Sequence, residues 1–368
     1  LGRSGAAARR HLPAIGWIEA DPTTLQDAED WLPHLAGFEA IVNAAGALQD
    51  GGRDDLVATQ QRAIVALVEA CEKAGIDRFV QISAPGADPA ADTAFMRTKG
   101  MADQRLRDSA LAWTILKPGL VIGANAYGGT ALVRMLAGFP MIEILILGDR
   151  HIQTVALSDV CEAVLKAVDG DLPSKTPYDL VASDIHTLRD VVGRFRAWLG
   201  LPPPRASIAL PDSAGSAVAG IADLAGRLGW RSPLRSTALK VLAQDIRGDA
   251  GPWLAATGQR LLSLDEMLAA MPSTRQERLF AKAQLVFPAL VVTLSAFWLV
   301  SGLIGVWQRE QAAALLPPWI PRPTQTALII AGSIIDVAIG IALLLRHWLT
   351  PAALGSIAIS VVYLAAGT

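Results

Sequence analysis

Short, nearly continuous apolar runs alternate with longer amphipathic stretches in the first third of the chain. The runs are rich in β-branched residues and predict buried strands at 17–20, 40–43, 78–83 and 113–117. The stretches between them have apolar residues at helical spacing and predict helices over residues 25–34, 55–74 and 95–108. Buried strands that alternate with helices predict a parallel sheet covered on both faces. Right-handed crossovers make that sheet doubly wound, so we predict an α/β, Rossmann-type fold.

After Gly119 the alternation loosens and the elements become shorter. Short strands are predicted at 144–147, 154–157 and 178–181, and helices at 158–168, with Ser158 as N-cap, and at 187–199. Residues 212–271 are mostly helical in pattern. We interpret this region as a mixed α/β lobe that closes over a nucleotide site and holds a substrate pocket.

The pattern changes again near residue 285, where long apolar runs with almost no charge begin. They cover residues 286–307, 324–345 and 351–368, and roughly 20 apolar residues suffice to cross a bilayer core of about 30 Å. The mean hydropathy of +0.37 is high because of these runs. We therefore predict a soluble domain at 1–271, a linker at 272–284 and a transmembrane helical bundle at 285–368.

Charge restricts the partners and the orientation of the chain. A net charge of −2 and a pI near 6.2 leave no basic surface for nucleic acid, so we expect no such partner. Arg275, Arg278 and Lys282 precede the first apolar run, which favours a cytoplasmic soluble domain on a multi-pass protein of the inner membrane. Asp336 lies within the second run, where a carboxylate either serves a function or bonds to another helix. The five histidines show no metal-ligand spacing, and no metal site is predicted.

Candidate ligand-binding residues gather at the carboxyl ends of the predicted strands, the edge at which open α/β sheets bind ligands. Small residues after the second strand let a flat ligand approach the backbone, and Gly46 permits a tight turn. The candidates are Asp21, Asn43, Ala44, Ala45, Gly46, Ser83, Lys99, Pro118 and Gly119.

These residues resemble the short-chain dehydrogenase/reductase superfamily, in its extended or atypical branch, over roughly residues 1–270. The resemblance is greatest to bacterial relatives of the nucleotide-binding accessory subunit of respiratory complex I. The tail resembles the DoxX-like membrane domain. The matching segments are 43–46, 81–84, 95–99, 116–119 and 155–160.

The resemblance implies a role for each candidate residue around a nicotinamide dinucleotide. Asp21 would contact the adenine, and residues 43–46 would line the adenosine ribose. Lys99 would bond to the nicotinamide ribose, and Ser83 would orient a substrate carbonyl. Pro118 and Gly119 would border the nicotinamide.

The sequence departs from the family pattern at two places. The family's glycine-rich phosphate loop belongs to a first strand and helix, which we expect upstream of Leu1, so the Rossmann domain is predicted to be N-terminally truncated. The chain also ends inside an apolar run, and we expect residues missing there too. The family's catalytic tyrosine, four residues before Lys99, is replaced by Phe95, which has no proton to transfer. Tyr127 is the nearest downstream tyrosine, and we do not favour it as a substitute.

Arg3 bears on the choice of cofactor. An arginine at the end of the second family strand accommodates the 2′-phosphate of NADP, so Arg3, with Arg9 and Arg10 nearby, favours NADP(H) over NAD(H). The alternative is a solvated basic turn.

Two hypotheses of different classes follow. The first is a membrane-anchored NAD(P)(H)-dependent oxidoreductase acting on a lipophilic carbonyl or quinone-like substrate, with Ser83 and Lys99 holding that substrate. The second is a non-catalytic, NADPH-binding structural or redox-sensing module of a membrane complex, which Phe95 favours. A sugar-nucleotide epimerase is disfavoured because it too needs the tyrosine.

Overall fold

The computed structural model describes residues 1–48, 50–51, 55–230, 234–314 and 316–367. It divides into two compact units. Unit 1 comprises Leu1–Ala222 and Pro233–Arg278, and unit 2 comprises Asp223–Ser232 and Leu279–Thr368. Thr368, the last residue of the third predicted span, lies outside the described residues.

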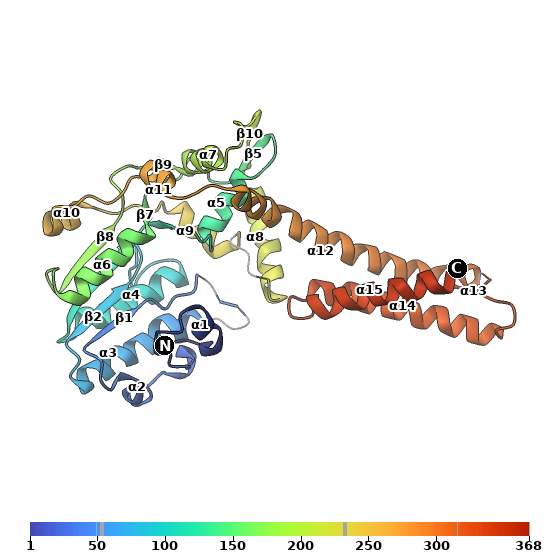
Figure 1. Ribbon diagram of the computed structural model, residues 1–368, viewed down its shortest axis with the longest axis horizontal. Helices are drawn as coiled ribbons and strands as arrows, with labels where there is room; N and C mark the ends of the chain where they lie inside the picture. The colour runs from blue at the N-terminus through green and yellow to red at the C-terminus, as the bar shows by residue number, and fades with distance from the viewer. Residues whose placement is uncertain (49, 52–54, 231–233, 315, 368) are drawn as a thin grey trace. The chain divides into compact units, whose positions relative to one another are not determined.

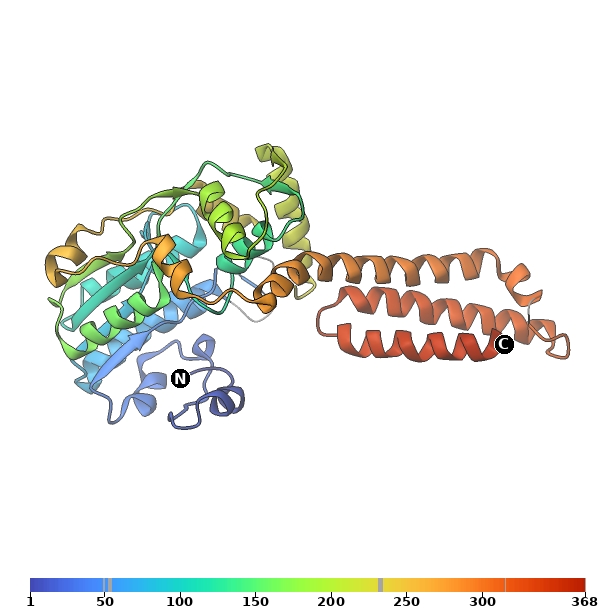
Figure 2. The ribbon, with the colours of Figure 1, turned by 45° about the horizontal axis from the view of Figure 1, so that its top comes forward.

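A parallel four-stranded sheet forms the centre of unit 1 (Figures 1 and 2). Its order is β1 (Ala40–Asn43), β2 (Arg78–Ile82), β3 (Ala112–Pro118), β8 (Thr176–Leu180). All three pairs of neighbours run parallel. The predicted α/β fold and strands 40–43, 78–83 and 113–117 are confirmed, because continuous apolar runs of this length suit a sheet buried on both faces.

Alternate residues of the central strands belong to different hydrophobic cores. Phe79 of β2 and Ile115 of β3 pack with the first core, and Val80 and Leu116 pack with the second. The first core is formed with α2 (Ala28–Leu35), α3 (Ala63–Ala74) and α4 (Ala94–Arg107). The second is formed with α6 (Leu157–Asp169) and α10 (Gly251–Thr257). Helices therefore cover both faces, which is the doubly wound arrangement predicted from the sequence.

Local signals set the ends of the helices that flank the sheet. α4 begins after Thr93, whose hydroxyl oxygen accepts a hydrogen bond from the Met96 N–H at 3.3 Å. α3 follows a π-helical segment, Val57–Arg62, and ends at Gly75, whose φ of 71° is a left-handed conformation that glycine adopts readily.

The first segment of the chain is less regular than the sequence predicts. Residues 17–20 were predicted to form a strand, but they form a single parallel bridge between Gly2 and Glu19. A strand needs several hydrogen-bonded residue pairs in a row, and this described segment forms one such pair. The segment also contains α1 (Gly5–His11) and a 3₁₀ turn, Pro22–Thr24.

The remainder of unit 1 forms the mixed lobe in three two-stranded sheets with helices around them. Its strand pairs are β4 (Leu120–Ile122) with β7 (Thr154–Ala156), β5 (Ile142–Leu145) with β10 (Ala206–Ala209), and β6 (His151–Ile152) with β9 (His186–Thr187). The further helices are α5 (Gly129–Ala137), α7 (Leu188–Trp198), α8 (Asp212–Arg227, which continues into unit 2), α9 (Ser236–Ala243) and α11 (Leu264–Ala270). Ser158 is not the N-cap of α6, because β7 runs directly into that helix and Ala156 takes the position.

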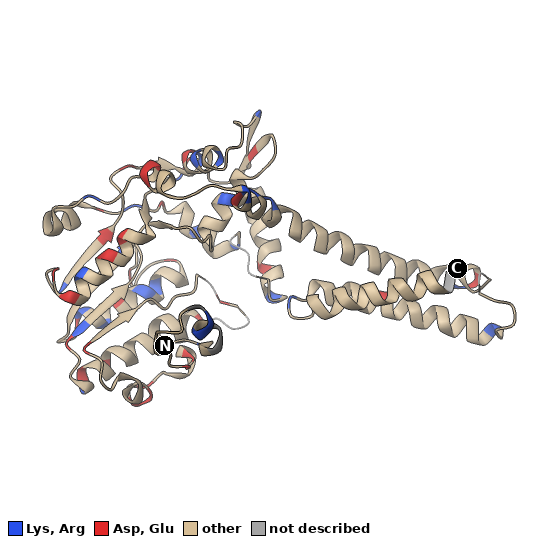
Figure 3. Ribbon diagram, viewed as in Figure 1, with Lys and Arg blue, Asp and Glu red and all other residues tan. Residues whose placement is uncertain are grey.

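Unit 2 contains α12 (Arg275–Trp307, whose first turn belongs to unit 1), α13 (Arg309–Ala314), α14 (Arg322–Leu344) and α15 (Leu349–Gly367). Among the described residues, α12 and α14 are long and apolar enough to cross a membrane. Figure 3 shows these helices almost free of charge along their middle parts. A Cβ on Gly302 would lie 2.6 Å from the Ser333 carbonyl oxygen, so glycine allows α12 and α14 to approach closely.

Asp336 joins the three long helices of unit 2. Its carboxylate accepts a hydrogen bond from Ser301 of α12 at 3.0 Å and one from Tyr363 of α15 at 2.8 Å. A buried carboxylate in an apolar bundle needs such donors. The interhelical bond considered from the sequence is therefore present.

Residues 223–230 belong to unit 2 although they precede its long helices by about fifty positions in the sequence. The Trp230 indole N–H donates to the Leu344 carbonyl at 2.6 Å, and the Arg346 guanidinium lies 5.6 Å from the centre of the indole ring. The Phe287 ring is a third neighbour of the indole, and the two ring centres lie 6.1 Å apart. The end of the soluble domain at residue 271 and the start of the helical bundle at residue 285 stay predictions from the sequence.

Candidate functional site

Asn43, at the carboxyl end of β1, organises the first part of the site. Its amide donates to the Gln81 side-chain oxygen at 2.8 Å, and its carbonyl oxygen accepts from the Ala45 N–H at 3.0 Å. These bonds fix the turn of residues 43–46 and leave Ala44 and Gly46 exposed. The turn therefore presents backbone and small side chains, as close approach of a flat ligand requires.

Lys99 on α4 lies opposite this turn. A Cβ built on Gly46 would be 3.6 Å from Lys99 Nζ, so the glycine and the ammonium face each other. Nζ donates to the Ile82 carbonyl at 2.9 Å, which leaves two of its three N–H donors for a ligand. Burial lowers the pKa of Lys99 to about 8, and the nearby charge of Asp103 opposes this effect.

Phe95 occupies the same face of α4, one turn before Lys99. Lys99 Nζ lies 5.8 Å from the centre of the phenyl ring, within cation–π range. The predicted substitution of tyrosine by phenylalanine therefore falls where the side chain faces the lysine. The ring stabilises the ammonium but cannot exchange a proton.

Ser83 is buried at the end of β2 and bonds to a residue that the sequence analysis missed. Its hydroxyl donates to Asp103 Oδ2 at 2.6 Å. Burial raises the pKa of Asp103, and the Ser83 hydrogen bond and the positive charges of Lys99, Lys117 and Arg107 oppose this effect. Asp103 follows Lys99 by four residues, so the helical i, i+4 spacing was the signal that could have found it.

Pro118 and Gly119 end β3 beside the same edge of the sheet. The Gly119 N–H donates to the Leu180 carbonyl at 3.0 Å. A Cβ at Gly119 would lie 2.5 Å from the Gln153 carbonyl oxygen, so only glycine fits where the two backbone segments approach. This contact joins the end of the sheet to the mixed lobe.

Arg3 and Asp21 belong to the first segment of the chain. Gly2 and Glu19 form a parallel bridge; Arg3 directly follows Gly2, and Asp21 lies two residues after Glu19. The Ala20 N–H donates to the Gly2 carbonyl at 3.2 Å. Asp21 Oδ1 accepts from the Thr23 N–H at 3.0 Å and caps the 3₁₀ turn. Tyr127, the alternative tyrosine, is 78% exposed. Hence the structure brings together Asn43, Gly46, Ser83 and Lys99.

Comparison with known proteins identifies both parts of the chain. Residues 6–138 match the family described as NAD(P)H-binding, and residues 295–368 match the DoxX-like family. The chain joins an NAD(P)H-binding domain to a DoxX-like domain. The two modules inferred from the residues are thereby confirmed.

Curated relatives match the NAD(P)H-binding domain. UPF0659 protein YMR090W of Saccharomyces cerevisiae is 33% identical over 114 residues, which are 28% of this chain and 48% of that protein. Protein fmp52, mitochondrial, of Aspergillus clavatus is 32% identical over 142 residues, 37% of this chain and 61% of that protein. The Arabidopsis thaliana protein NADH dehydrogenase (ubiquinone) 1 alpha subcomplex subunit 9, mitochondrial, is 26% identical over 149 residues, 38% of this chain and 37% of that protein. The chain thus spans less than two thirds of each relative.

Solved structures share the fold of the NAD(P)H-binding domain. The Bordetella bronchiseptica enzyme WbmH, in complex with NAD+, aligns with a TM-score of 0.53 at 16% identity, covering 73% of this chain and 87% of that one. The dTDP-glucose 4,6-dehydratase of Bacillus anthracis, in complex with NAD, aligns with a TM-score of 0.53 at 13% identity, covering 75% and 83%. At these identities the likeness confirms the fold.

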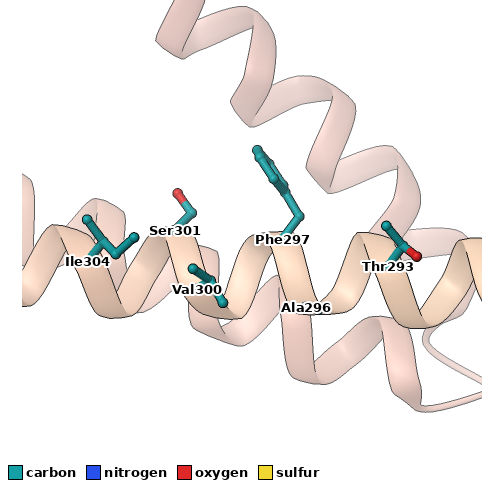
Figure 4. A pocket seen from close by; sticks show the side chains of 6 residues that line it. All are labelled: Thr293, Ala296, Phe297, Val300, Ser301 and Ile304. Atoms are coloured by element: carbon teal, nitrogen blue, oxygen red, sulfur yellow. The ribbon is translucent and has the colours of Figure 1, made fainter.

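The DoxX-like domain has an open groove of about 580 Å³ along α12 (Figure 4). Ser301, which donates to Asp336, contributes a hydroxyl to a lining that is otherwise largely apolar. The lining residues are Thr293, Ala296, Phe297, Val300, Ser301 and Ile304.

Proposed function

We propose that the chain is a membrane-anchored NAD(P)(H)-dependent oxidoreductase that acts on a lipophilic carbonyl or quinone-like substrate. The observation that carries the proposal is the buried Lys99 ammonium, which faces Gly46 and retains two N–H donors. Such a cation binds vicinal ribose hydroxyls well, because its charge strengthens each hydrogen bond. Bound nicotinamide dinucleotide would supply or accept the hydride.

The chain's own residues would bind and orient the reactants. The turn of residues 43–46 would hold the adenosine ribose, Lys99 the nicotinamide ribose, and Pro118 and Gly119 the nicotinamide. Ser83 would orient the reacting oxygen. The exposed Arg3, beside the Gly2–Glu19 bridge, supports NADP(H) over NAD(H), since a guanidinium pairs with a 2′-phosphate.

A membrane anchor explains why the substrate would be lipophilic. The DoxX-like match and the two long apolar helices support a multi-pass protein of the inner membrane. The basic residues before the first span support a cytoplasmic NAD(P)H-binding domain. A substrate dissolved in the bilayer would then be concentrated near the anchored domain.

The alternative is a non-catalytic, NADPH-binding module of a membrane complex. Phe95 favours it, because the side chain facing Lys99 has no proton to exchange. The similarity to a subunit of a mitochondrial NADH dehydrogenase also favours it. We prefer the enzyme because Ser83 follows β2 and the Lys99 ammonium bonds to the Ile82 carbonyl at the end of the same strand.

Binding and turnover distinguish the two functions. NADPH and NADH are titrated by fluorescence against the detergent-purified protein. Oxidation of the reduced cofactor is then followed with decylubiquinone and with geranial. Acceptor-dependent oxidation supports the oxidoreductase, tight binding without oxidation supports the module, and absence of binding contradicts both.

A further inference from the structure

The bond between Ser83 and Asp103 determines which hydrogen-bonding groups Ser83 can offer to a substrate. Its single proton is donated to Asp103 Oδ2 at 2.6 Å, so Ser83 Oγ can act toward a substrate only as an acceptor, through its lone pairs. An acceptor cannot bind the oxygen of a carbonyl, but it can bind a hydroxyl group. In this state the site is arranged for an alcohol or phenol.

Asp103 is suited to receive that proton. It is fully buried, and its other oxygen, Oδ1, has no hydrogen-bond partner among the described residues. A carboxylate that is poorly solvated is a stronger base than an exposed one. Lys99, Lys117 and Arg107 are the charged groups that act on it, and all three are positive and moderate this effect.

We propose that Ser83 and Asp103 form a proton relay that takes the place of the missing tyrosine. When an alcohol is oxidised, its O–H bond breaks and the proton passes to Ser83 Oγ, while the Ser83 proton passes to Asp103 Oδ2. Bound oxidised nicotinamide dinucleotide would accept the hydride from the carbinol carbon, which leaves a carbonyl. Carbonyl reduction is the reverse, with Asp103 starting as the acid.

The relay agrees with the other contacts of the site. The Lys99 ammonium donates to the Ile82 carbonyl, and the Asp103 carboxylate accepts from Ser83. Phe95 covers Lys99 without competing for the proton. Between turnovers Asp103 would return the proton to solvent water through Ser83. The inference rests on the proposed oxidoreductase function and adds its acid–base residue and a hydroxyl-bearing substrate class.

The test compares the full chain with Asp103→Asn, Ser83→Ala and the double variant. Asp108→Asn is the matched control, because Asp108 is the exposed cap of the same helix. Geraniol with NADP+ and geranial with NADPH are the probes. We expect kcat to fall roughly 10²–10⁴-fold in each single variant, with KM nearly unchanged and no further loss in the double variant.

The pH profile provides a readout that a structural role would not change. Alcohol oxidation by the wild type should rise with pH as Asp103 becomes deprotonated, and this limb should be absent in Asp103→Asn. A carboxyl-carbon NMR titration without substrate is the second readout. Ser83→Ala should raise the pKa of Asp103, because the hydrogen bond from Ser83 lowers it.

The outcomes separate the relay from the proposed function. Wild-type turnover that survives Asp103→Asn, or losses that multiply in the double variant, would overturn the relay alone. An unchanged Asp103 titration in Ser83→Ala would also overturn it. A wild type that binds cofactor but turns over none of geraniol, geranial and decylubiquinone would overturn both the oxidoreductase and the relay.

Discussion

Phe95 lacks the one group, a phenol hydroxyl, that the expected tyrosine would bring to the site. Its ring lies on the face of α4 that carries Lys99, so a phenol at this position would come close to the ammonium. A neighbouring cation favours the charged form of a phenol and therefore eases its proton transfer. The remainder of the site determines whether such a phenol would be productive.

Phe95→Tyr should therefore raise turnover by roughly 10²-fold, the lower end of the range that general acid–base catalysis contributes. The affinity for NADPH should stay unchanged, and steady-state kinetics with geranial and fluorescence titration measure the two effects. Phe38→Tyr is the control, since Phe38 is 52% exposed and belongs to no part of the site. No gain at all would count against a catalytic arrangement of Ser83 and Lys99.

Lys99 links the site to the pH dependence of stability. Its folded-state pKa is about 8, against 10.5 for the ordinary value. Between these values the unfolded chain binds more protons than the folded chain, so the free energy of unfolding of the wild type rises with pH across this window.

Lys99→Met should abolish that rise and stabilise the domain at neutral pH by on the order of 3 kcal/mol, because no buried charge remains. Urea unfolding on either side of the window between about 8 and 10.5 measures the effect. Lys240→Met, on the partly exposed α9, is a control that should keep the wild-type profile. A parallel profile for wild type and Lys99→Met would contradict the burial of this charge.

At the scale of elements, the position of α4 depends on a close contact with the loop before it. A Cβ on Gly100 would lie 2.2 Å from the Asp88 carbonyl carbon and 2.5 Å from the Pro89 nitrogen. Both are backbone atoms and cannot rotate away. Helix and loop must therefore separate if any side chain is introduced.

Gly100→Ala should destabilise the domain by about 1–3 kcal/mol through overpacking, and it should weaken NADPH binding by displacing Lys99. Gly193→Ala in α7 is the matched helix control, because nothing lies within 4 Å of its added Cβ. That control should stabilise by about 0.5–1 kcal/mol. Chemical denaturation and cofactor titration distinguish the two, and equal stability of both variants would disprove the contact.

The elements also show what the sequence could predict. Strands 40–43, 78–83 and 113–117 were predictable because each is a short, nearly continuous apolar run that pairs in one parallel sheet. Residues 17–20 read as a strand, but a ladder needs partners that the local pattern does not reveal. Asp103 was missed because a single carboxylate on a helix resembles a surface charge, and only the fold places it beside Ser83.

At the scale of the whole molecule, the chain passes between the two units at three positions. These lie between 222 and 223, between 232 and 233, and between 278 and 279. Residues 223–230 are held in unit 2 by the bond from Trp230 to Leu344 and by the neighbouring Arg346 and Phe287. A single cut near residue 274 would therefore leave this segment attached to the membrane unit.

We expect the two fragments to copurify after cleavage at a protease site inserted after Thr274. Size-exclusion chromatography in detergent measures this. Trp230→Ala should release the NAD(P)H-binding fragment by removing the indole hydrogen bond and its ring contacts. Trp319→Ala is the control, since this indole is 80% exposed. Separation of the fragments without any substitution would contradict the assignment of residues 223–230 to unit 2.

The bond from Trp230 to Leu344 spans 114 residues, and this has a consequence for synthesis on the ribosome. At about 5–20 residues per second, Leu344 emerges roughly 6–23 s after Trp230. The second core is completed within that interval, since it includes Trp253 and Leu261, whereas the indole still has no acceptor. The Trp230 indole therefore stays without its carbonyl partner until α14 has been synthesised, and slow synthesis of α12 and α14 would prolong its exposure to chaperones.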